Sequence, residues 1–462
     1  MLTVEKIGGT SMSRFQDVLT NIIIGKRERK DLFNRIFVVS AYNNVTNWLL
    51  EHKKTGEPGI YARFAEQTDY HGPLEELVEK LIGINETFAD SGLDLAAAEA
   101  YIRERISKTK LTLDSLAHVL SSGYLDRQSI LLAAREILAS VGESHSAWNS
   151  VNILHNNQIR AILVDLSGAR DSQFLTIDER VRKSFRGIDF SKTVTIATGY
   201  AKGTEGIMRE FDRGYSEVTF SKVAVAVRAD EAVIHKEFHL SSADPKIVGT
   251  DKSVVLNFTN YDVADQLADV GMEAIHPKAS KPLENAGINL RIKNTFEPDH
   301  PGTLISKDYV GRESRVEIIA GTDKVVIVEV YDPSMVGQVG FDMRIMELFT
   351  RYNVSYVVKT TNANSISMVI WEKDKDKGLI KELKERYQSV TVKNVAVVCA
   401  IGTNFAKPGV LAKAANALAA NRINVECISQ SLRQTNMQFV IRREAFEKAI
   451  IALNDALCVD RS

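Results

Sequence analysis

The sequence predicts an α/β protein with a mainly parallel sheet, followed by two small ferredoxin-like modules of the βαββαβ type. Three observations support this fold class. Residues 1–300 alternate between short buried strands and helical patterns, which is typical of a parallel sheet covered by helices on both faces. After His300 the sequence is rich in residues typical of β-strands, and a βαββ pattern occurs twice. At 462 residues the chain is also too long for one ordinary core.

The first part of the chain supplies the strands of the expected parallel sheet. Residues 2–4 open it, and helical patterns such as 129–138 lie between later strands. Residues 43–125 are more polar and helix-rich, so they are expected to form an appended lobe or insertion. The further strands are predicted at 36–40, 161–165, 194–197, 224–227 and 288–292.

The second part contains an internal repeat. The separation from Gly340 to Val354 equals that from Gly409 to Ile423, and each interval reads as an amphipathic helix. Two ferredoxin-like modules would bury the open faces that neither covers alone; one irregular α+β domain is the alternative. We expect a catalytic domain at 1–305 and modules at 306–385 and 386–462. The predicted strands are 325–330, 355–359, 365–370, 395–401, 425–429 and 437–441.

Composition excludes several classes of function. A formal net charge of -1 gives no support for nucleic-acid binding. The longest apolar runs, such as 325–330 and 395–401, are far shorter than the roughly 20 residues that cross a bilayer. The odd set Cys399, Cys427 and Cys458 lacks metal-type spacing and favours free thiols in a reducing compartment. We therefore expect a cytoplasmic enzyme without nucleic-acid or membrane partners and without a metal held by protein side chains.

The motif at the start of the chain is the most informative local pattern. It reads Lys6-Ile7-Gly8-Gly9-Thr10-Ser11 and lies between a strand-like run and a helical pattern. Glycines let backbone N–H groups approach an anion, and a lysine and a helix start add positive charge. The pattern favours a phosphate-binding turn, although it lacks the spacing of a Walker A loop. An ordinary strand-to-helix turn is the alternative.

Together with a parallel α/β domain and a doubled C-terminal module, this motif resembles the aspartokinase family. The resemblance covers nearly the whole chain and implies an amino-acid-kinase αβα sandwich followed by two ACT modules. Gly199-Tyr200 resembles the family's Gly-Phe turn, and residues 212–217 resemble its Gly-Arg-Gly-Gly-Ser-Asp loop. The other matches, in order, are Ser40-Ala41 with 45–47, Gly142-Glu143 at the expected start of a helix, Asp165, Thr176, Asp178, 243–246 and 275–277.

The resemblance implies transfer of the ATP γ-phosphoryl group to the β-carboxylate of L-aspartate, giving 4-phospho-L-aspartate and ADP. A carboxylate is already ionised at pH 7, so no general base is required. Phosphoryl transfer then depends on positioning and on neutralising charge. Lys6, the N–H groups of Gly8 and Gly9 and the Mg²⁺ that accompanies ATP would offset the repulsion between the carboxylate and the triphosphate.

The resemblance also assigns the residues of the site. Arg213 is expected to bind the α-carboxylate of aspartate through two hydrogen bonds, because its guanidinium is planar; a surface arginine is the alternative. Glu143 is expected to take the substrate ammonium, or else to favour a helix dipole from a first turn. Lys6 and Glu217 are the expected catalytic residues. Further substrate contacts are Ser40, Thr46 and Ser216, and the nucleotide contacts are Lys6, Gly8, Gly9, Thr10, Ser11, His235, Lys236 and Lys246.

The chain departs from the family pattern at a few positions. Tyr215 stands where the family has its second glycine, so it must point away from the aspartate pocket or reshape it. Glu217 replaces an aspartate. His235-Lys236 replace Thr-Asp on the nucleotide side, and Glu273 replaces a lysine, which preserves the charge count but changes the geometry. These departures, together with residues 5–9 at the start of the chain, are similar to the aspartokinases associated with ectoine synthesis.

The C-terminal repeats resemble ACT modules, which in this family bind amino acids and mediate dimer contacts. Backbone N–H groups at the turn between a strand and a helix can hold an effector carboxylate. Modules that only dimerise the enzyme are the alternative, and the sequence identifies no effector. The expected effector residues are Asp332, Gly340, Phe341, Asn404, Pro408, Gly409 and Val410.

Two other functions remain open on the sequence. One is a kinase of the same fold that acts on another carboxylate, such as acetylglutamate; Glu143 and Arg213 together favour a free amino acid instead. The other is a catalytically weak amino-acid-binding regulator, in which the changes at His235, Lys236 and Glu273 mark a decayed nucleotide site.

Overall fold

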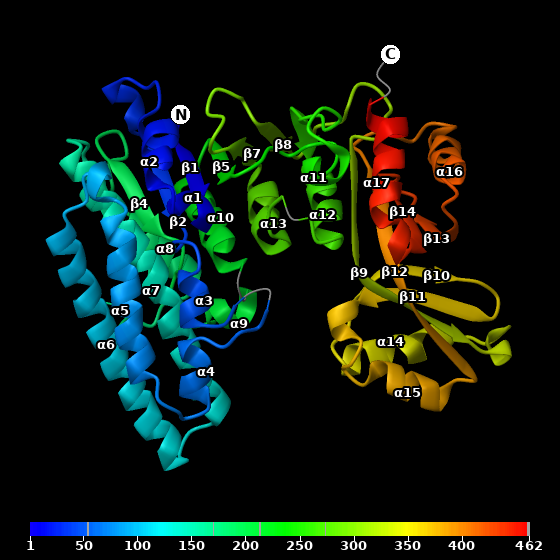
Figure 1. Ribbon diagram of the computed structural model, residues 1–462, viewed down its shortest axis with the longest axis horizontal. Coiled ribbons are helices and arrows are strands. Elements are labelled where there is room, and N and C mark those ends of the chain that lie inside the picture. The colour runs from blue at the N-terminus through cyan, green and yellow to red at the C-terminus, as the bar shows by residue number, and fades with distance from the viewer. Residues whose placement is uncertain (53–54, 170, 212–213, 273, 460–462) are drawn as a thin grey trace. The chain divides into compact units, whose positions relative to one another are not determined.

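The computed structural model describes residues 1–52, 55–169, 171–211, 214–272 and 274–459. These residues form two compact units (Figure 1). The first unit contains Met1–His239 and Ile275–Leu304. The second contains Leu240–Ala274 and the chain from Ile305 onward. The predicted boundaries at 305 and 385 stay a prediction.

The first unit is built on a parallel sheet, as predicted. Its strands have the order β3-β4-β2-β1-β5-β7, so β1 lies at the centre between β2 and β5. Lys6 of β1 is opposite Val38 of β2 and Ile234 of β5. The strands are β1 (Thr3–Ile7), β2 (Arg35–Val39), β3 (Ala161–Val164), β4 (Val194–Thr198), β5 (Glu231–Lys236) and β7 (Asn289–Asn294).

Helices cover this sheet, and three long ones, α5, α6 and α7, lie side by side (Figure 1). α10 packs on β1 and β2, whereas α7 packs on β3 and β4. The helical segments are α1 (Gly9–Met12), α2 (Phe15–Asp17), η1 (Val18–Ile24), η2 (Arg29–Leu32), α3 (Val45–Leu49), α4 (Ile60–Ala65), α5 (His71–Glu86), η3 (Ala89–Ser91), α6 (Leu95–Ser122), α7 (Arg127–Asn156), α8 (Ile177–Phe185), α9 (Ile207–Phe211), α10 (Tyr215–Val227) and α13 (Pro277–Ala286).

Side-chain caps fix where several of these helices begin. Asp94 and Asp126 accept backbone N–H groups at the starts of α6 and α7. Thr176 and Glu179 form a reciprocal capping box at the start of α8. Thr176, which matched a family motif in the sequence, therefore has a structural role in this fold.

Two local predictions are wrong. The strand predicted at 224–227 is the end of α10, and the strand of this region is β5, which follows it. The run alternates valine and alanine, and although only Ala224 in it is buried, a short apolar run of this kind does not separate a helix from a strand by its period. Glu143 does not begin a helix either, because it lies in the middle of α7. The first-turn dipole role considered for Glu143 is thus excluded.

The second unit contains an antiparallel sheet with the order β10-β11-β9-β12-β14-β13. Its strands are β9 (Ile318–Tyr331), β10 (Tyr356–Thr361), β11 (Ser365–Trp371), β12 (Ser389–Ile401), β13 (Val425–Gln430) and β14 (Asn436–Arg442). Its other elements are α11 (Pro245–Val248), β6 (Phe258–Asn260), α12 (Tyr261–Asp269), η5 (Pro333–Met335), α14 (Phe341–Arg351), η6 (Glu372–Asp374), α15 (Leu379–Arg386), α16 (Val410–Ala420), η7 (Arg443–Ala445), α17 (Phe446–Asn454) and η8 (Asp455–Val459), while β8 (Thr303–Ser306) spans the boundary of the units.

The predicted βαββ repeat is present, and its two copies share their long strands. β9-α14-β10-β11 is the first copy and β12-α16-β13-β14 the second. β9 pairs with β12 along its whole length, with a register shift between Val395 and Val397. Residues 389–395 thereby supply a fourth strand beside the first copy, and residues 318–322 supply one beside the second. The two copies therefore form a single continuous sheet.

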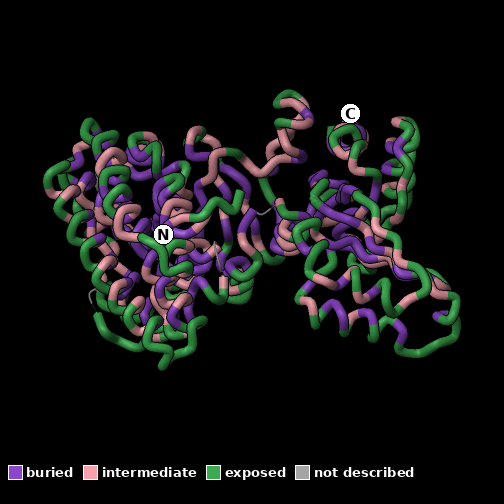
Figure 2. Tube along the Cα trace, turned by 60° about the horizontal axis from the view of Figure 1, so that its bottom comes forward, coloured by how far each residue is buried: buried purple, intermediate pink, exposed green. Residues whose placement is uncertain are grey.

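Buried residues follow the strands of both units, whereas the outer helical surfaces are exposed (Figure 2). Cys399 and Cys458 are buried, Cys427 is half-buried, and none of the three forms a disulfide. Within the described parts of the chain, no helix combines the length and apolar character needed to cross a membrane.

Candidate functional site

The predicted strand–turn–helix motif is confirmed at the start of the chain. β1 ends at Ile7, Gly8 is extended, and α1 begins at Gly9. A Cβ atom at Gly9 would lie 2.7 Å from the Ala41 carbonyl oxygen, so glycine allows this turn to pack against the loop after β2. The first N–H groups of a helix have no intrahelical acceptor and can serve an anion.

The next two residues of the motif differ in their surroundings. Thr10 is exposed. Ser11 is buried, and its hydroxyl lies 3.0 Å from the Thr295 hydroxyl in a hydrogen bond. The Ser11 side chain therefore fastens α1 to the segment after β7, and only its backbone can face a phosphate.

Residues after β2 and β4 converge on the same edge of the sheet. The Ser40 N–H donates to the Ile7 carbonyl at 3.1 Å, and the Gly199 N–H donates to the Val39 carbonyl at 2.9 Å. A Cβ atom at Gly199 would lie 2.9 Å from Cβ of Ser216, at the start of α10. The hydroxyls of Ser40 and Ser216 are 3.3 Å apart. Ligands of parallel α/β sheets bind at this carboxyl edge.

Glu217 connects Lys6 to the start of α13. The Lys6 ammonium is 3.5 Å from one carboxylate oxygen of Glu217, and the other oxygen accepts the His276 N–H at 2.6 Å. Burial alone would raise the pKa of Glu217, but the charges of Lys6 and Lys236 and the His276 hydrogen bond hold it below its usual value. Glu217 is therefore ionised at neutral pH and orients the lysine.

Tyr215 points toward the predicted substrate pocket. Its hydroxyl donates to a carboxylate oxygen of Glu143 at 2.8 Å, and both residues are buried. The ring of Tyr215 makes an edge contact with Tyr200, whose hydroxyl donates to Glu136 at 2.7 Å. The tyrosine that replaces a family glycine thus reshapes the pocket around Glu143.

The remaining predicted site residues are not all brought together. Lys236 ends β5 on the face of the sheet that carries Lys6. His235 points to the opposite face, where its ring nitrogen lies 2.8 Å from Glu5. Thr46 lies in α3 after the loop that follows β2. Lys246 is the second residue of α11, in the second unit.

Arg213 and Glu273 lie outside the described residues. The predicted bond between the Arg213 guanidinium and the α-carboxylate of aspartate therefore stays a prediction, as does the consequence of the glutamate at 273.

The predicted effector residues lie at two equivalent turns of the second unit. Gly340 and Gly409 both adopt left-handed backbone conformations directly before α14 and α16, which begin at Phe341 and Val410. Asp332 caps η5 by accepting the Ser334 N–H at 2.9 Å. The other two residues are Asn404, whose side-chain amide donates to the Gly311 carbonyl at 2.9 Å, and Pro408, which is exposed.

Sequence reasoning missed the contact between Tyr215 and Glu143, the hydrogen bond from His276 to Glu217, and the close approach at Gly199. The signals were weak. A tyrosine in a glycine-rich loop signals a changed pocket but not its partner, and His276-Pro277 reads as an ordinary helix start.

The donor set at this edge suits a triphosphate. Lys6, Lys236 and the backbone of the β1–α1 turn provide positive charge and N–H donors on one side of the sheet. In the described ranges, no cluster of three or more His, Cys, Asp or Glu side chains could hold a metal ion by itself. A Mg²⁺ ion would therefore depend on phosphate oxygens for much of its coordination.

Comparisons with known proteins give consistent results. The model of the amino acid kinase family matches residues 1–294, and that of an ACT domain matches residues 398–457. The aspartate kinase Ask_Ect of Stutzerimonas stutzeri (strain A1501) is 48% identical over 466 residues, covering 99% of this chain and 97% of the relative. The chloroplastic aspartokinase 1 of Arabidopsis thaliana is 24% identical over 480 residues, covering 98% and 79%.

Solved structures show the same fold. The aspartate kinase of Clostridium acetobutylicum matches with a TM-score of 0.73 and 21% identity, over 98% of this chain and 100% of that chain. Escherichia coli aspartokinase III, in complex with aspartate and ADP, matches with a TM-score of 0.72 and 18% identity over 99% of both chains.

Proposed function

This chain belongs to the amino acid kinase family and is an aspartate kinase, and we propose that the carboxyl edge around β1 carries its phosphoryl transfer. When bound, ATP with Mg²⁺ supplies the γ-phosphoryl group and part of the charge neutralisation. The Lys6 ammonium and the backbone N–H groups of Gly8 and Gly9 stabilise the negative charge of the phosphates. Glu217 holds the Lys6 ammonium in position through their 3.5 Å contact.

We propose that the aspartate lies beside this phosphate site. Glu143 accepts the substrate ammonium, and Ser40 and Ser216 contribute hydroxyl contacts. The 2.8 Å bond from Tyr215 fixes the Glu143 carboxylate. Arg213 supplies the guanidinium for the α-carboxylate, on the chemistry of that side chain. The β-carboxylate then attacks the γ-phosphorus as an ionised nucleophile, and no protein group has to remove a proton.

The nucleotide contacts proposed for Lys236 and Lys246 rest on their charges, and those of Thr10 and Ser11 on their backbone N–H groups. We exclude His235 from the nucleotide contacts, because its side chain contacts Glu5 on the face of the sheet opposite to that of Lys6. Thr46 remains a proposed substrate contact on α3.

One observation carries this proposal: Lys6 and Glu217, separated by 211 residues, form a contact where the ends of β1 and β2 meet α10. The test is hydroxylamine trapping of the acyl phosphate, with MgATP and L-aspartate as substrates. Wild type should form the hydroxamate only with aspartate, and Lys6→Met should lower kcat about 10²- to 10³-fold. Lys192→Met is the control, because Lys192 is an exposed lysine elsewhere on this unit. Hydroxamate formed equally well from N-acetylglutamate would contradict the assignment.

We further propose that the turns at Gly340 and Gly409 bind an amino-acid effector and that the ACT-like sheet also mediates a homodimer. Support comes from E. coli aspartokinase III, which has been crystallised with lysine and aspartate and shares this fold. Lysine, threonine and ectoine should each be tested for inhibition and for a change in oligomeric state. No effect of any of them on either property would contradict this regulatory role.

The 48% identity to Ask_Ect supports a place in aspartate-family, and specifically ectoine, biosynthesis. Three cysteines that form no disulfide support function in the cytoplasm. Ectoine accumulation in a host that lacks its own aspartate kinase, with and without this chain, would test the pathway.

A further inference from the structure

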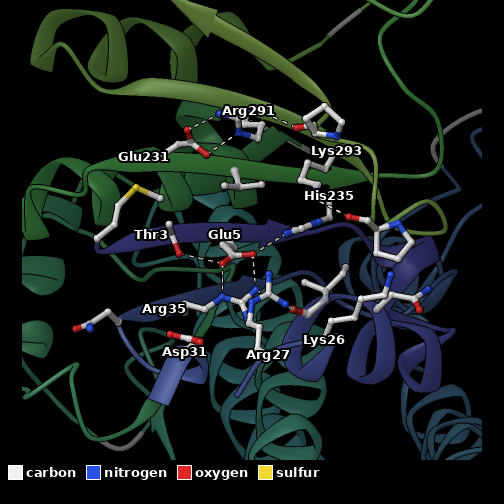
Figure 3. Close-up of a pocket in the computed structure, with 18 of the residues that line it drawn as sticks. Thr3, Glu5, Lys26, Arg27, Asp31, Arg35, Glu231, His235, Arg291 and Lys293 are labelled. Carbon is white, nitrogen blue, oxygen red and sulfur yellow. Dashed lines mark hydrogen bonds and ion pairs between the residues drawn. The ribbon is translucent and has the colours of Figure 1, made fainter. Parts of the chain in front are cut away.

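A large cavity in the first unit lies away from the proposed phosphoryl-transfer site. It has a volume of about 1030 Å³ and follows the face of the sheet that carries Thr3 and Glu5 (Figure 3). Successive side chains of a strand point to opposite faces, so the Lys6 side chain lies on the other face of β1. The lining runs along β5 from Glu231 to His235 and along β7 from Arg291 to Asn294, so the cavity extends along this face of the sheet.

The floor of the cavity is electrically balanced. Arg35 donates to both carboxylate oxygens of Glu5, at 2.6 and 2.9 Å, and the His235 ring nitrogen lies 2.8 Å from one of them. Thr3 adds a hydrogen bond of 2.9 Å. Glu5, Arg35 and His235 are all buried. The Glu5 carboxylate is ion-paired with Arg35 and accepts further hydrogen bonds. This cluster is therefore nearly neutral and would attract a charged ligand only weakly.

The walls carry more positive than negative charge. Glu231 pairs with Arg291 through two hydrogen bonds of 2.7 and 2.9 Å, and Lys26 pairs with Asp299 at 2.9 Å. Six Lys or Arg residues and four Asp or Glu residues line the cavity, an excess of two positive charges. They are Lys26, Arg27, Lys30, Arg35, Arg291 and Lys293, against Glu5, Asp31, Glu231 and Asp299.

Among the described residues, two of these cations form no direct ion pair, although the charge of Glu5 acts on both and that of Asp31 acts on Arg27. Arg27 donates to the Ile22 carbonyl at 2.8 Å, and Lys293 donates to the Pro298 carbonyl at 3.1 Å. In the part of the chain that the structure describes, neither has a carboxylate within ion-pair distance. Figure 3 shows them on two sides of the Glu5–His235 bond.

Neighbouring positive charges lower the pKa values of both cations. Burial lowers the pKa of Lys293, and the charge of Arg27 lowers it further. Burial and the charge of Arg35 lower the pKa of Arg27 in the same way. Like charges that face one shared space repel each other, and an anion between them would relieve this repulsion.

We propose that this cavity binds a small polyanion, with Arg27 and Lys293 as its cationic contacts. A guanidinium binds phosphate or carboxylate through a planar fork, and a lysine adds a point charge. The side chains of Asn21 and Asn294 add polar groups to the wall. The volume lies at the upper end of the range of small-molecule pockets, so the cavity admits ligands up to nucleotide size. This site is independent of the proposed phosphoryl-transfer residues.

The test is calorimetric titration of the full chain with sodium pyrophosphate and, separately, with sodium citrate at constant ionic strength. The two probes distinguish a phosphate ligand from a carboxylate ligand. Binding should persist in Lys6→Met, which removes the main cation of the proposed ATP site. It should weaken at least tenfold in Arg27→Met/Lys293→Met and change less than twofold in Arg186→Met/Lys192→Met.

The control pair removes the same charge from exposed positions that do not line the cavity. Lys293→Gln is the milder variant, and binding should weaken at least threefold in it even if the double variant folds poorly. Absence of binding for both anions would overturn the proposal. Loss of binding in Lys6→Met with retention in the Arg27/Lys293 variant would also overturn it. Because the readout is binding, failure of this proposal leaves the kinase assignment unaffected.

Discussion

At the residue scale, the bond from Tyr215 to Glu143 is the feature that distinguishes the substrate end of this site. A buried carboxylate is costly unless donors satisfy it. Tyr215 supplies one such donor at 2.8 Å, and its ring packs against Tyr200. The hydroxyl therefore sets the orientation in which Glu143 meets the substrate ammonium.

Tyr215→Phe should raise KM for aspartate about tenfold, equivalent to about 1.4 kcal/mol, and should change kcat less. The lost donor leaves Glu143 less well oriented, while the phosphate contacts are intact. Tyr70→Phe is the control, because Tyr70 makes a similar bond to Asp114 at 2.6 Å before α5. An unchanged KM for aspartate in Tyr215→Phe would contradict this role.

His145 gives a residue-scale prediction about pH. Burial lowers the pKa of His145 from its ordinary 6.5 to about 3. The unfolded chain therefore binds more protons than the folded chain between these values, and the free energy of unfolding falls as the pH falls. Between pH 7 and pH 4 the contribution of His145 should be a loss of about 3 kcal/mol.

Urea unfolding at pH 7 and pH 4 measures this loss. His145→Gln should be less sensitive to the pH change than wild type, whereas His118→Gln, at an exposed position, should behave like wild type. Equal pH sensitivity of His145→Gln and wild type would exclude a buried, neutral His145.

At the scale of elements, the close approach of β4 to α10 assembles the site. Gly199→Ala would place a Cβ atom 2.7 Å from the Val39 carbonyl oxygen and 2.9 Å from Cβ of Ser216. We expect a loss of about 1–3 kcal/mol in unfolding free energy and a lower kcat/KM, because α10 must move.

Gly83→Ala is the matched control, because Gly83 lies within α5 with no atom near its added Cβ. It should stabilise the protein by about 0.5–1 kcal/mol. Gly199→Ala with wild-type stability and kinetics would contradict the argument.

The elements also show what the sequence could predict. The parallel strands and the βαββ repeat follow from apolar periodicity, and the structure confirms them. The run 224–227 was predicted as a strand because a short, alternating apolar run looks the same in a helix and in a strand. The Tyr215–Glu143 bond and the Glu5–Arg35–His235 cluster join residues far apart in the chain, so no local pattern could place them.

At the scale of the whole molecule, the two halves of the C-terminal sheet should unfold together. β9 and β12 run through both halves, so neither half keeps all its strand pairs without the other. Val328→Ala removes buried apolar contacts from β9 in the first half. Amide exchange should then accelerate in β14 as well as in β11.

Hydrogen–deuterium exchange with mass spectrometry gives this measurement, and Val310→Ala is the control at an exposed position of the same unit. Acceleration confined to β11 would show that the halves are independent modules, contrary to the shared-strand arrangement.

The most direct test of the central account is a comparison of steady-state kinetics for Lys6→Met and Glu143→Gln with L-aspartate as the varied substrate. If Lys6 binds the phosphates and Glu143 binds the substrate ammonium in one site, Lys6→Met should mainly lower kcat and Glu143→Gln should mainly raise KM for aspartate. Wild-type kinetics in both variants would contradict the account.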